Sequence, residues 1–256
     1  MQLTVNDILV KLQEIAPFEN AEPYDNVGLI IGHGNNPVTK VLVALDATEE
    51  VVDEAIEMNA ELIITHHPLF FHARKNLVED DPEARIVCKM IRNHLNLISA
   101  HTNLDKSEFS GSMACARLLG LQNIRQEGLL FVGELAENKT AELLFREIKE
   151  KIDENAREFG NMEKNILTVA VCGGAYDEGW TQAKALGAHA YLTGEVRHHN
   201  AIAAVMEDMV LFDAGHFGTE VTLIPALVFY LQKWLNDVEY NVIVNSSNKN
   251  PYGRLG

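Results

Sequence analysis

The stretch Ala60-Glu-Leu-Ile-Ile-Thr-His-His-Pro-Leu-Phe-Phe71 decides the fold. Its apolar part, Leu62 to Thr65, is rich in β-branched residues and predicts a buried strand. His66 and His67 follow at the carboxyl end, where Pro68 cannot continue a central strand. Open α/β sheets place their ligands beyond the carboxyl ends of their strands, so the histidine pair indicates a candidate metal site. The alternative is a pair of polar loop residues.

Composition narrows the class of protein. The chain has 256 residues, of which 47% are hydrophobic, and a formal net charge of −16. This charge disfavours electrostatic binding to nucleic acid or to an anionic membrane, and it helps to hold a divalent cation. Cys88, Cys115 and Cys172 are widely spaced and form no Cys-x-x-Cys motif, which predicts a reducing compartment and three small core residues rather than a thiolate metal site.

No targeting or membrane segment is expected. The N-terminus lacks a charged-then-apolar signal pattern. The longest late apolar run, residues 223–235, is interrupted by Pro225, Gln232 and Lys233 and is too short to span a bilayer. We therefore expect a soluble cytoplasmic protein.

Hydrophobic periodicity predicts alternating helices and strands. Apolar residues spaced three and four apart indicate an amphipathic helix over residues 4–15, and Thr48 is a typical N-cap for a second helix. Further helices are expected at 82–95, 112–119, 142–152, 177–186 and 221–235, and strands at 41–45, 62–65, 97–100, 166–172, 190–193 and 210–213. The polar tail, residues 245–256, is expected to be loosely ordered.

The second half of the sequence repeats the plan of the first. An offset of 128 residues places Val41 on Val169 and Thr65 on Thr193, and seven of these 25 positions are identical. The sequence therefore predicts an internally duplicated α/β protein with mostly parallel sheets. We expect the first repeat to span residues 1–127 and the second to span residues 128–256.

Two further corners carry a histidine followed by a carboxylate four residues later. His101 and Asp105 follow one predicted strand, and His216 and Glu220 follow the equivalent strand of the other repeat. This spacing puts both side chains of a pair on one face of a helical turn, where a simple surface pair is the alternative. With the histidine pair at 66–67, these donors exceed the needs of one tetrahedral ion. The surplus favours two metal ions bridged by a carboxylate, and nitrogen and oxygen donors suit Zn, Fe, Mn, Co or Ni.

Taken in order along the chain, six segments resemble the Nif-three-like dinuclear metal-centre family, many of whose members are known as GTP cyclohydrolase I type 2 homologues. The resemblance runs from about residue 5 to residue 245. The six segments are Asp25-Asn26-Val-Gly-Leu, Thr65-His66-His67-Pro68-Leu-Phe-Phe71, His101-Thr-Asn-Leu-Asp105, Cys172-Gly-Gly174, Thr193-Gly194-Glu195 with His199, and Asp213-Ala-Gly-His216-x-x-x-Glu220.

The resemblance implies two intertwined α/β repeats, a toroidal homohexamer and a two-metal site between the repeats. Some members carry a domain inserted between the halves, and the short connection at residues 127–140 leaves no room for one. The implied metal ligands are His66, His67, Asp105, His216 and Glu220, with Glu220 as the bridge, while His101 and His199 line the site.

The roles of three neighbouring features stay open at this point. Glu195 lines or supports the site, or is simply an acid at the start of a helix. Gly173-Gly174 presents backbone N–H groups to a phosphate, or forms a plain tight turn. His199 carries a proton, or is a buried histidine bonded to a backbone carbonyl.

The function implied is a dinuclear-metal-dependent hydrolase that opens the ring of GTP or a related nucleotide, with His101 or His199 moving the proton. The alternative is a non-catalytic metal-binding hexamer that stores, delivers or senses metal, or that scaffolds a partner. Turnover of nucleotides by metal-loaded protein distinguishes the two.

Overall fold

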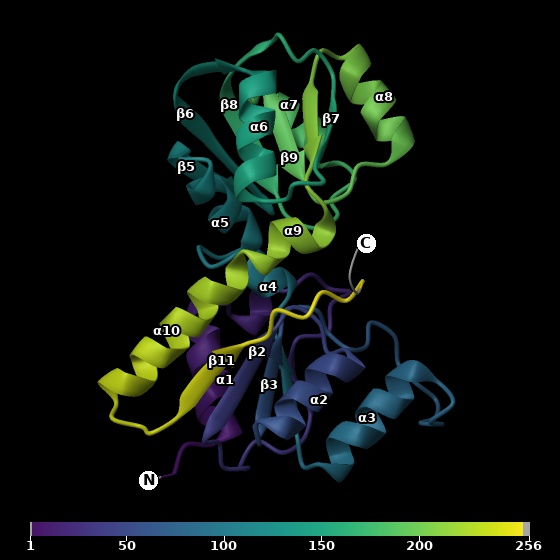
Figure 1. Cartoon of the computed structure of the whole chain (residues 1–256), viewed down its shortest axis with the longest axis vertical. Helices are drawn as coiled ribbons and strands as arrows, with labels where there is room; N and C mark the ends of the chain where they lie inside the picture. Colours follow the sequence, from purple (N-terminus) through teal and green to yellow (C-terminus); the bar gives the residue numbers. More distant parts are fainter. Residues whose placement is uncertain (1, 253–256) are drawn as a thin grey trace. The chain divides into compact units, whose positions relative to one another are not determined.

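The computed structural model describes residues 2–252, which form two compact units (Figure 1). The first unit contains residues 2–107 and 224–252, and the second unit contains residues 108–223. The chain thus leaves the first unit after residue 107 and returns to it for its last segment.

The first unit is built on a five-stranded sheet in the order β1-β4-β3-β2-β11. Four strands run parallel, and β1 pairs antiparallel with β4 at the edge. The strands are β1 (Gly28–Ile31), β2 (Lys40–Ala44), β3 (Leu62–Thr65), β4 (Asn96–Ser99) and β11 (Ile243–Ser246). The helices are α1 (Val5–Ile15), α2 (Glu49–Glu57), α3 (Pro82–Arg92), α4 (Thr102–Asp105) and α10 (Leu223–Asp237), with a 3-10 turn at Phe18–Asn20.

Local sequence fixes where these helices begin. The Thr4 side chain caps α1 in a capping box with Asp7, and Thr48 caps α2. Asp81 caps α3, whose first residue is Pro82, a residue that the first helical turn tolerates. The apolar faces of α2 and α3 then pack with the sheet residues Leu42, Ile63 and Leu97 into one core.

The second unit is built on a six-stranded sheet in the order β5-β6-β8-β9-β10-β7. Its centre, β8-β9-β10, is parallel, and the other pairings are antiparallel. The strands are β5 (Gln122–Glu127), β6 (Leu130–Thr140), β7 (Arg157–Phe159), β8 (Asn165–Cys172), β9 (Ala190–Thr193) and β10 (Val210–Asp213). The helices are α5 (Gly111–Leu118), α6 (Ala141–Lys151), α7 (Gly179–Ala185), α8 (His198–Met206) and α9 (His216–Val221).

Both faces of this second sheet are covered. Along β8, Val169 and Val171 enter one apolar cluster while Ala170 and Cys172 enter another. Successive strand residues point to opposite faces, so the two clusters lie on the two sides of the sheet. A strand with both faces buried is a nearly continuous apolar run in the sequence, and the sequence therefore predicts this strand.

The fold class expected from the sequence is confirmed. The chain is an α/β protein with two sheets, and in each sheet four strands run in one direction. Among the described residues, no helix is long and apolar enough to cross a membrane. The three cysteines are free; Cys115 and Cys172 are buried and Cys88 is partly buried.

Three local expectations were wrong. Residues 127–140 are no plain connection, because Leu130, Phe131 and Val132 are buried in β6 and pair within the sheet. Residues 245–246 belong to β11 rather than to a loose tail, because they hydrogen-bond with β2; residues 253–256 lie outside the described residues. The helix expected from residue 221 begins only at Leu223 as α10, with Pro225 in its first turn, because residue 221 still belongs to the separate short helix α9, which carries His216 and Glu220.

The compact units do not divide the chain where the sequence repeat does. The first half contributes α5 and β5 to the second unit, while the second half contributes α10 and β11 to the first. A repeat at residues 1–127 and 128–256 describes the sequence, whereas the units describe packing. The division into two ancestral repeats stays a prediction.

Candidate metal centre

In the first unit, parallel pairing brings three strand ends together. Ala44 of β2 lies opposite Thr65 of β3, which in turn lies opposite Ser99 of β4. The carboxyl ends of all three strands lie on the same side of the sheet, so the residues that follow these strands lie close in space. His66 and His67 follow β3, and His101 follows β4.

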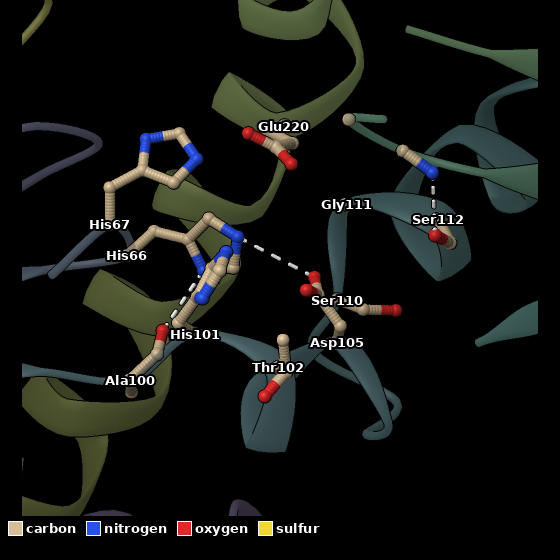
Figure 2. Close-up of polar contacts among 12 residues, drawn as sticks. His66, His67, Ala100, His101, Thr102, Asp105, Ser110, Gly111, Ser112 and Glu220 are labelled. Atoms are coloured by element: carbon tan, nitrogen blue, oxygen red, sulfur yellow. Dashed lines mark hydrogen bonds and ion pairs between the residues drawn. The ribbon is translucent and has the colours of Figure 1, made fainter. Parts of the chain in front are cut away.

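His66 and His67 are each held through one ring nitrogen. His66 Nδ1 lies 2.9 Å from the carbonyl oxygen of Ala100 (Figure 2), so Nδ1 must carry the proton and donate it. His67 Nδ1 lies 2.8 Å from a carboxylate oxygen of Asp46. With Nδ1 engaged, Nε2 of each ring keeps a lone pair for a metal ion, which is the usual arrangement of metal-ligating histidines.

His101 is held by a buried acid in the same way. Its Nδ1 lies 3.0 Å from Asp25, whose side chain is fully buried and also accepts hydrogen bonds from the backbone N–H and hydroxyl of Thr102. Burial alone would raise the pKa of Asp25, but the hydrogen bonds from His101 and Thr102 outweigh it and hold this pKa well below its usual range. The ionised Asp25 therefore fixes the tautomer of His101 that leaves Nε2 unprotonated.

The three imidazoles form one cluster. Their ring centroids are 5.0 Å apart for His66 and His67, 5.1 Å for His66 and His101, and 5.5 Å for His67 and His101. One ring nitrogen from each lies within 4.8 Å of the others, close enough to share an ion. Asp105, on α4, brings a carboxylate oxygen to 3.5 Å from His66 Nε2 (Figure 2).

This donor set fits a divalent transition-metal ion. Two ligands of one tetrahedral ion with bonds of about 2.1 Å lie roughly 3.4 Å apart, close to the spacing between His66 and Asp105. The donors are imidazole nitrogen and carboxylate oxygen without sulfur, as expected from the sequence.

The second unit holds the other two expected ligands, on α9. His216 Nε2 lies 3.1 Å from a carboxylate oxygen of Glu220, one helical turn away. His216 Nδ1 lies 2.7 Å from Glu195. Glu195 thus supports His216, and this contact favours the first of the two readings of Glu195 that the sequence left open.

Glycines at the ends of β8 and β9 make room for α9. A Cβ atom on Gly174 would lie 2.2 Å from a Glu220 oxygen, and one on Gly194 would lie 2.7 Å from the Thr219 hydroxyl. The N–H of Gly173 donates to the hydroxyl of Ser112, and the N–H of Gly174 donates to the hydroxyl of Thr219. Both groups are engaged within the fold, so the tight-turn reading holds and the phosphate reading is wrong.

His199 lies in the first turn of α8, and its side chain is exposed. The alternative of a buried histidine bonded to a carbonyl is therefore wrong. Within residues 108–223, the described structure gives His199 no side-chain hydrogen bond. Its proposed role as a proton carrier stays a prediction.

Sequence reasoning missed Asp46. Its signal was available, because it directly follows the apolar run at 41–45 and so lies at the end of a strand beside His67. Asp25 was noted within a motif, but its bond to His101 joins residues 76 positions apart, which no local pattern reveals.

The fold and these donor groups define a class of α/β protein with candidate metal ligands at the ends of parallel strands. Within that class, the chain belongs to the Duf34/NIF3 (NGG1p interacting factor 3) family, which matches residues 3–251. It is 33% identical over 261 residues to the GTP cyclohydrolase 1 type 2 homolog of Clostridium perfringens, covering 98% of this chain and 99% of the relative. The resemblance drawn from the six sequence segments is confirmed.

Two solved structures share the fold. The Staphylococcus aureus hypothetical protein SA1388 matches with a TM-score of 0.92 and 30% identity over 100% of both chains. A Bacillus cereus protein related to NIF3 matches with a TM-score of 0.92 and 25% identity over 98% of both chains.

Proposed function

We propose that the chain is a dinuclear-metal-dependent hydrolase that acts on GTP or a related nucleotide. The observation that carries the proposal is the cluster at the strand ends, where each Nδ1 is engaged, so that Nε2 of His66 and His67 can bind a metal ion and Nε2 of His101 can take up a proton. The name of the relatives, GTP cyclohydrolase 1 type 2 homolog, supports the nucleotide as substrate.

Five residues are proposed to hold two divalent ions chosen among Zn, Fe, Mn, Co and Ni. His66, His67 and Asp105 would contribute from the first unit, and His216 and Glu220 from the second, with Glu220 as the bridging carboxylate. Bound metal would lower the pKa of a water molecule toward neutrality and polarise the electrophilic carbon of the substrate.

The chain's own residues are proposed to move the protons. Opening the imidazole ring of guanine by water requires that a proton leave the water and that a ring nitrogen gain one. His101 Nε2 has a lone pair because Asp25 holds the proton on Nδ1, so it can accept a proton and give it back. His199 is exposed and is free to exchange protons with solvent.

The test is turnover by metal-reconstituted protein supplied with GTP. We expect a ring-opened product at a rate that falls with the metal content of the protein. The Glu220→Ala variant, prepared in parallel, should lose the activity, which excludes a trace contaminant as its source. Full metal loading without turnover of any nucleotide would instead favour the non-catalytic metal-binding reading, in which the protein stores, delivers or senses metal or scaffolds a partner.

A homohexamer and a cytoplasmic location complete the proposal. Light scattering under native salt should give six times the mass of one chain. A monomer would contradict the assembly and leave the proposed chemistry to be judged by turnover alone.

A further inference from the structure

The first unit contains a cleft of about 930 Å³ that the metal ligands do not account for. It is lined by β1, by α3 and by the segment at residues 70–77, which follows the histidine pair. Ligand pockets typically measure about 300–1,000 Å³, so this cleft has room for a molecule the size of a nucleotide.

The walls of the cleft expose large apolar side chains. Phe71 is 47% exposed, Leu77 is 49% exposed and Ile91 is 55% exposed, and all three line this one cleft. Apolar surface left in water is unfavourable, and covering it is a driving force for binding. Three such side chains gathered around a hollow favour a ligand that covers them.

The rim of the cleft carries one uncompensated positive charge. Arg74 is paired with Asp81 and Glu83, so its charge is neutralised and its side chain is held in place. Lys75 lines the same cleft and is exposed, and within the described residues it forms no salt bridge. In a chain with a net charge of −16, this lysine is suited to meet an anionic group.

One end of the cleft reaches the imidazole cluster. Asp25 lines the cleft and holds His101 through a 3.0 Å contact. The Phe71 ring also lies against His101, with ring centroids 5.6 Å apart. A molecule in the cleft would therefore have one edge beside the proposed proton carrier.

We propose that this cleft binds the flat heteroaromatic ring of a nucleoside phosphate among Phe71, Leu77 and Ile91, with Lys75 facing its phosphate. Stacking on an aromatic face and burial of apolar side chains would hold the ring. The inference deepens the proposed function and rests on it, because it assigns a recognition subsite to the same substrate.

The test is calorimetric titration of metal-loaded protein with GTP, guanosine and inorganic tripolyphosphate. Ile91→Glu places a carboxylate in the cleft and should weaken GTP binding at least tenfold. Val10→Glu is the matched control, because Val10 is 60% exposed on α1 and does not line the cleft. Lys75→Ala should weaken GTP binding several-fold and leave guanosine binding unchanged.

Metal content and melting temperature are measured on every variant, so that lost binding is not mistaken for unfolding. If Ile91→Glu binds GTP like the parent protein, or if the parent protein binds no GTP at millimolar concentration, the proposal is overturned. GTP binding that depends on Ile91 without any turnover would support the cleft while removing the proposed hydrolase activity. The two proposals can therefore fail separately.

Discussion

In both sheets, a histidine that follows one parallel strand is held by a carboxylate that follows the neighbouring parallel strand. In the first unit, Asp46 follows β2 and holds His67, which follows β3. In the second unit, Glu195 follows β9 and holds His216, which follows β10. In both cases the carboxylate lies 21 residues before the histidine and at the end of the preceding parallel strand. In both units, a βαβ unit therefore supplies a candidate ligand together with the carboxylate that holds it.

The two units differ in which elements carry the proposed ligands. The corner after β3 carries two imidazoles itself, whereas the equivalent corner after β9 carries Gly194 and Glu195. In the second unit the proposed ligands come from α9 instead, and the glycines at the strand ends allow α9 to approach closely. Imidazole side chains follow β3, whereas glycines follow β8 and β9 and leave space for α9.

The largest expected effect concerns Glu220 on α9. Glu220→Ala should lose at least one of two metal ions per chain, because the proposed bridging carboxylate is gone. Elemental analysis after reconstitution measures this loss. Glu142→Ala is a suitable control, since Glu142 pairs with Arg146 at the same helical spacing in the same unit. Full metal content in the Glu220 variant would contradict the proposal that the second unit contributes ligands through α9.

The next effect concerns His199. His199→Ala should keep both metals but lower hydrolytic activity about 10²-fold or more, the scale of a lost general acid or base. His198→Ala provides the comparison, because both histidines are exposed in the first turn of α8. Equal hydrolysis rates in the two variants, measured per metal-loaded chain, would contradict a catalytic role for His199.

The supporting carboxylates should matter less than the ligands. Asp46→Asn and Glu195→Gln are expected to lower metal affinity about 10- to 100-fold, the usual scale for such partners. Asp46 should lie at the upper end, because its side chain is 28% exposed and that of Glu195 is 56% exposed. Competition with a chelator measures both. If only the Asp46 variant loses metal affinity, the two carboxylates have the same geometry but do not contribute equally to metal binding.

The last effect concerns stability rather than metal binding, and it involves Gly194, which follows β9. Gly194→Ala should destabilise the protein by about 1–3 kcal/mol, because its Cβ would overlap Thr219 and two backbone groups. Gly173→Ala is the matched control, since its nearest neighbour would be 3.5 Å away. Denaturant unfolding compares them. Equal free energies of unfolding for the two variants would mean that α9 does not need the space that Gly194 leaves by having no side chain.

The sequence predicted well whatever depends on local pattern. The strand at 62–65 and the cap at Thr48 follow from apolar runs and side-chain chemistry that act within a few residues. The candidate ligands were found for a related reason, since each follows a predicted strand. The alternation of strand and helix, together with the resemblance to the family, was sufficient to select them.

The features that the sequence did not predict depend on pairing between residues far apart in the chain. The polar end of β6, near Lys139, reads as loop but pairs with β8. The sequence predicted a helix from residue 221 and did not show that this residue ends α9, before α10 begins at Leu223. The bond between Asp25 and His101 requires the fold to be known first.

The return of the chain to the first unit has a consequence during synthesis. β11 pairs with β2 from Ile243 opposite Lys40 to Ser246 opposite Val43, so it covers one edge of that sheet. At about 5–20 residues per second, β2 leaves the ribosome roughly 10–40 s before β11 does. During that interval, the apolar edge strand is open to pairing with another chain. Translation speed over the second unit thus sets how long each new molecule is exposed to aggregation.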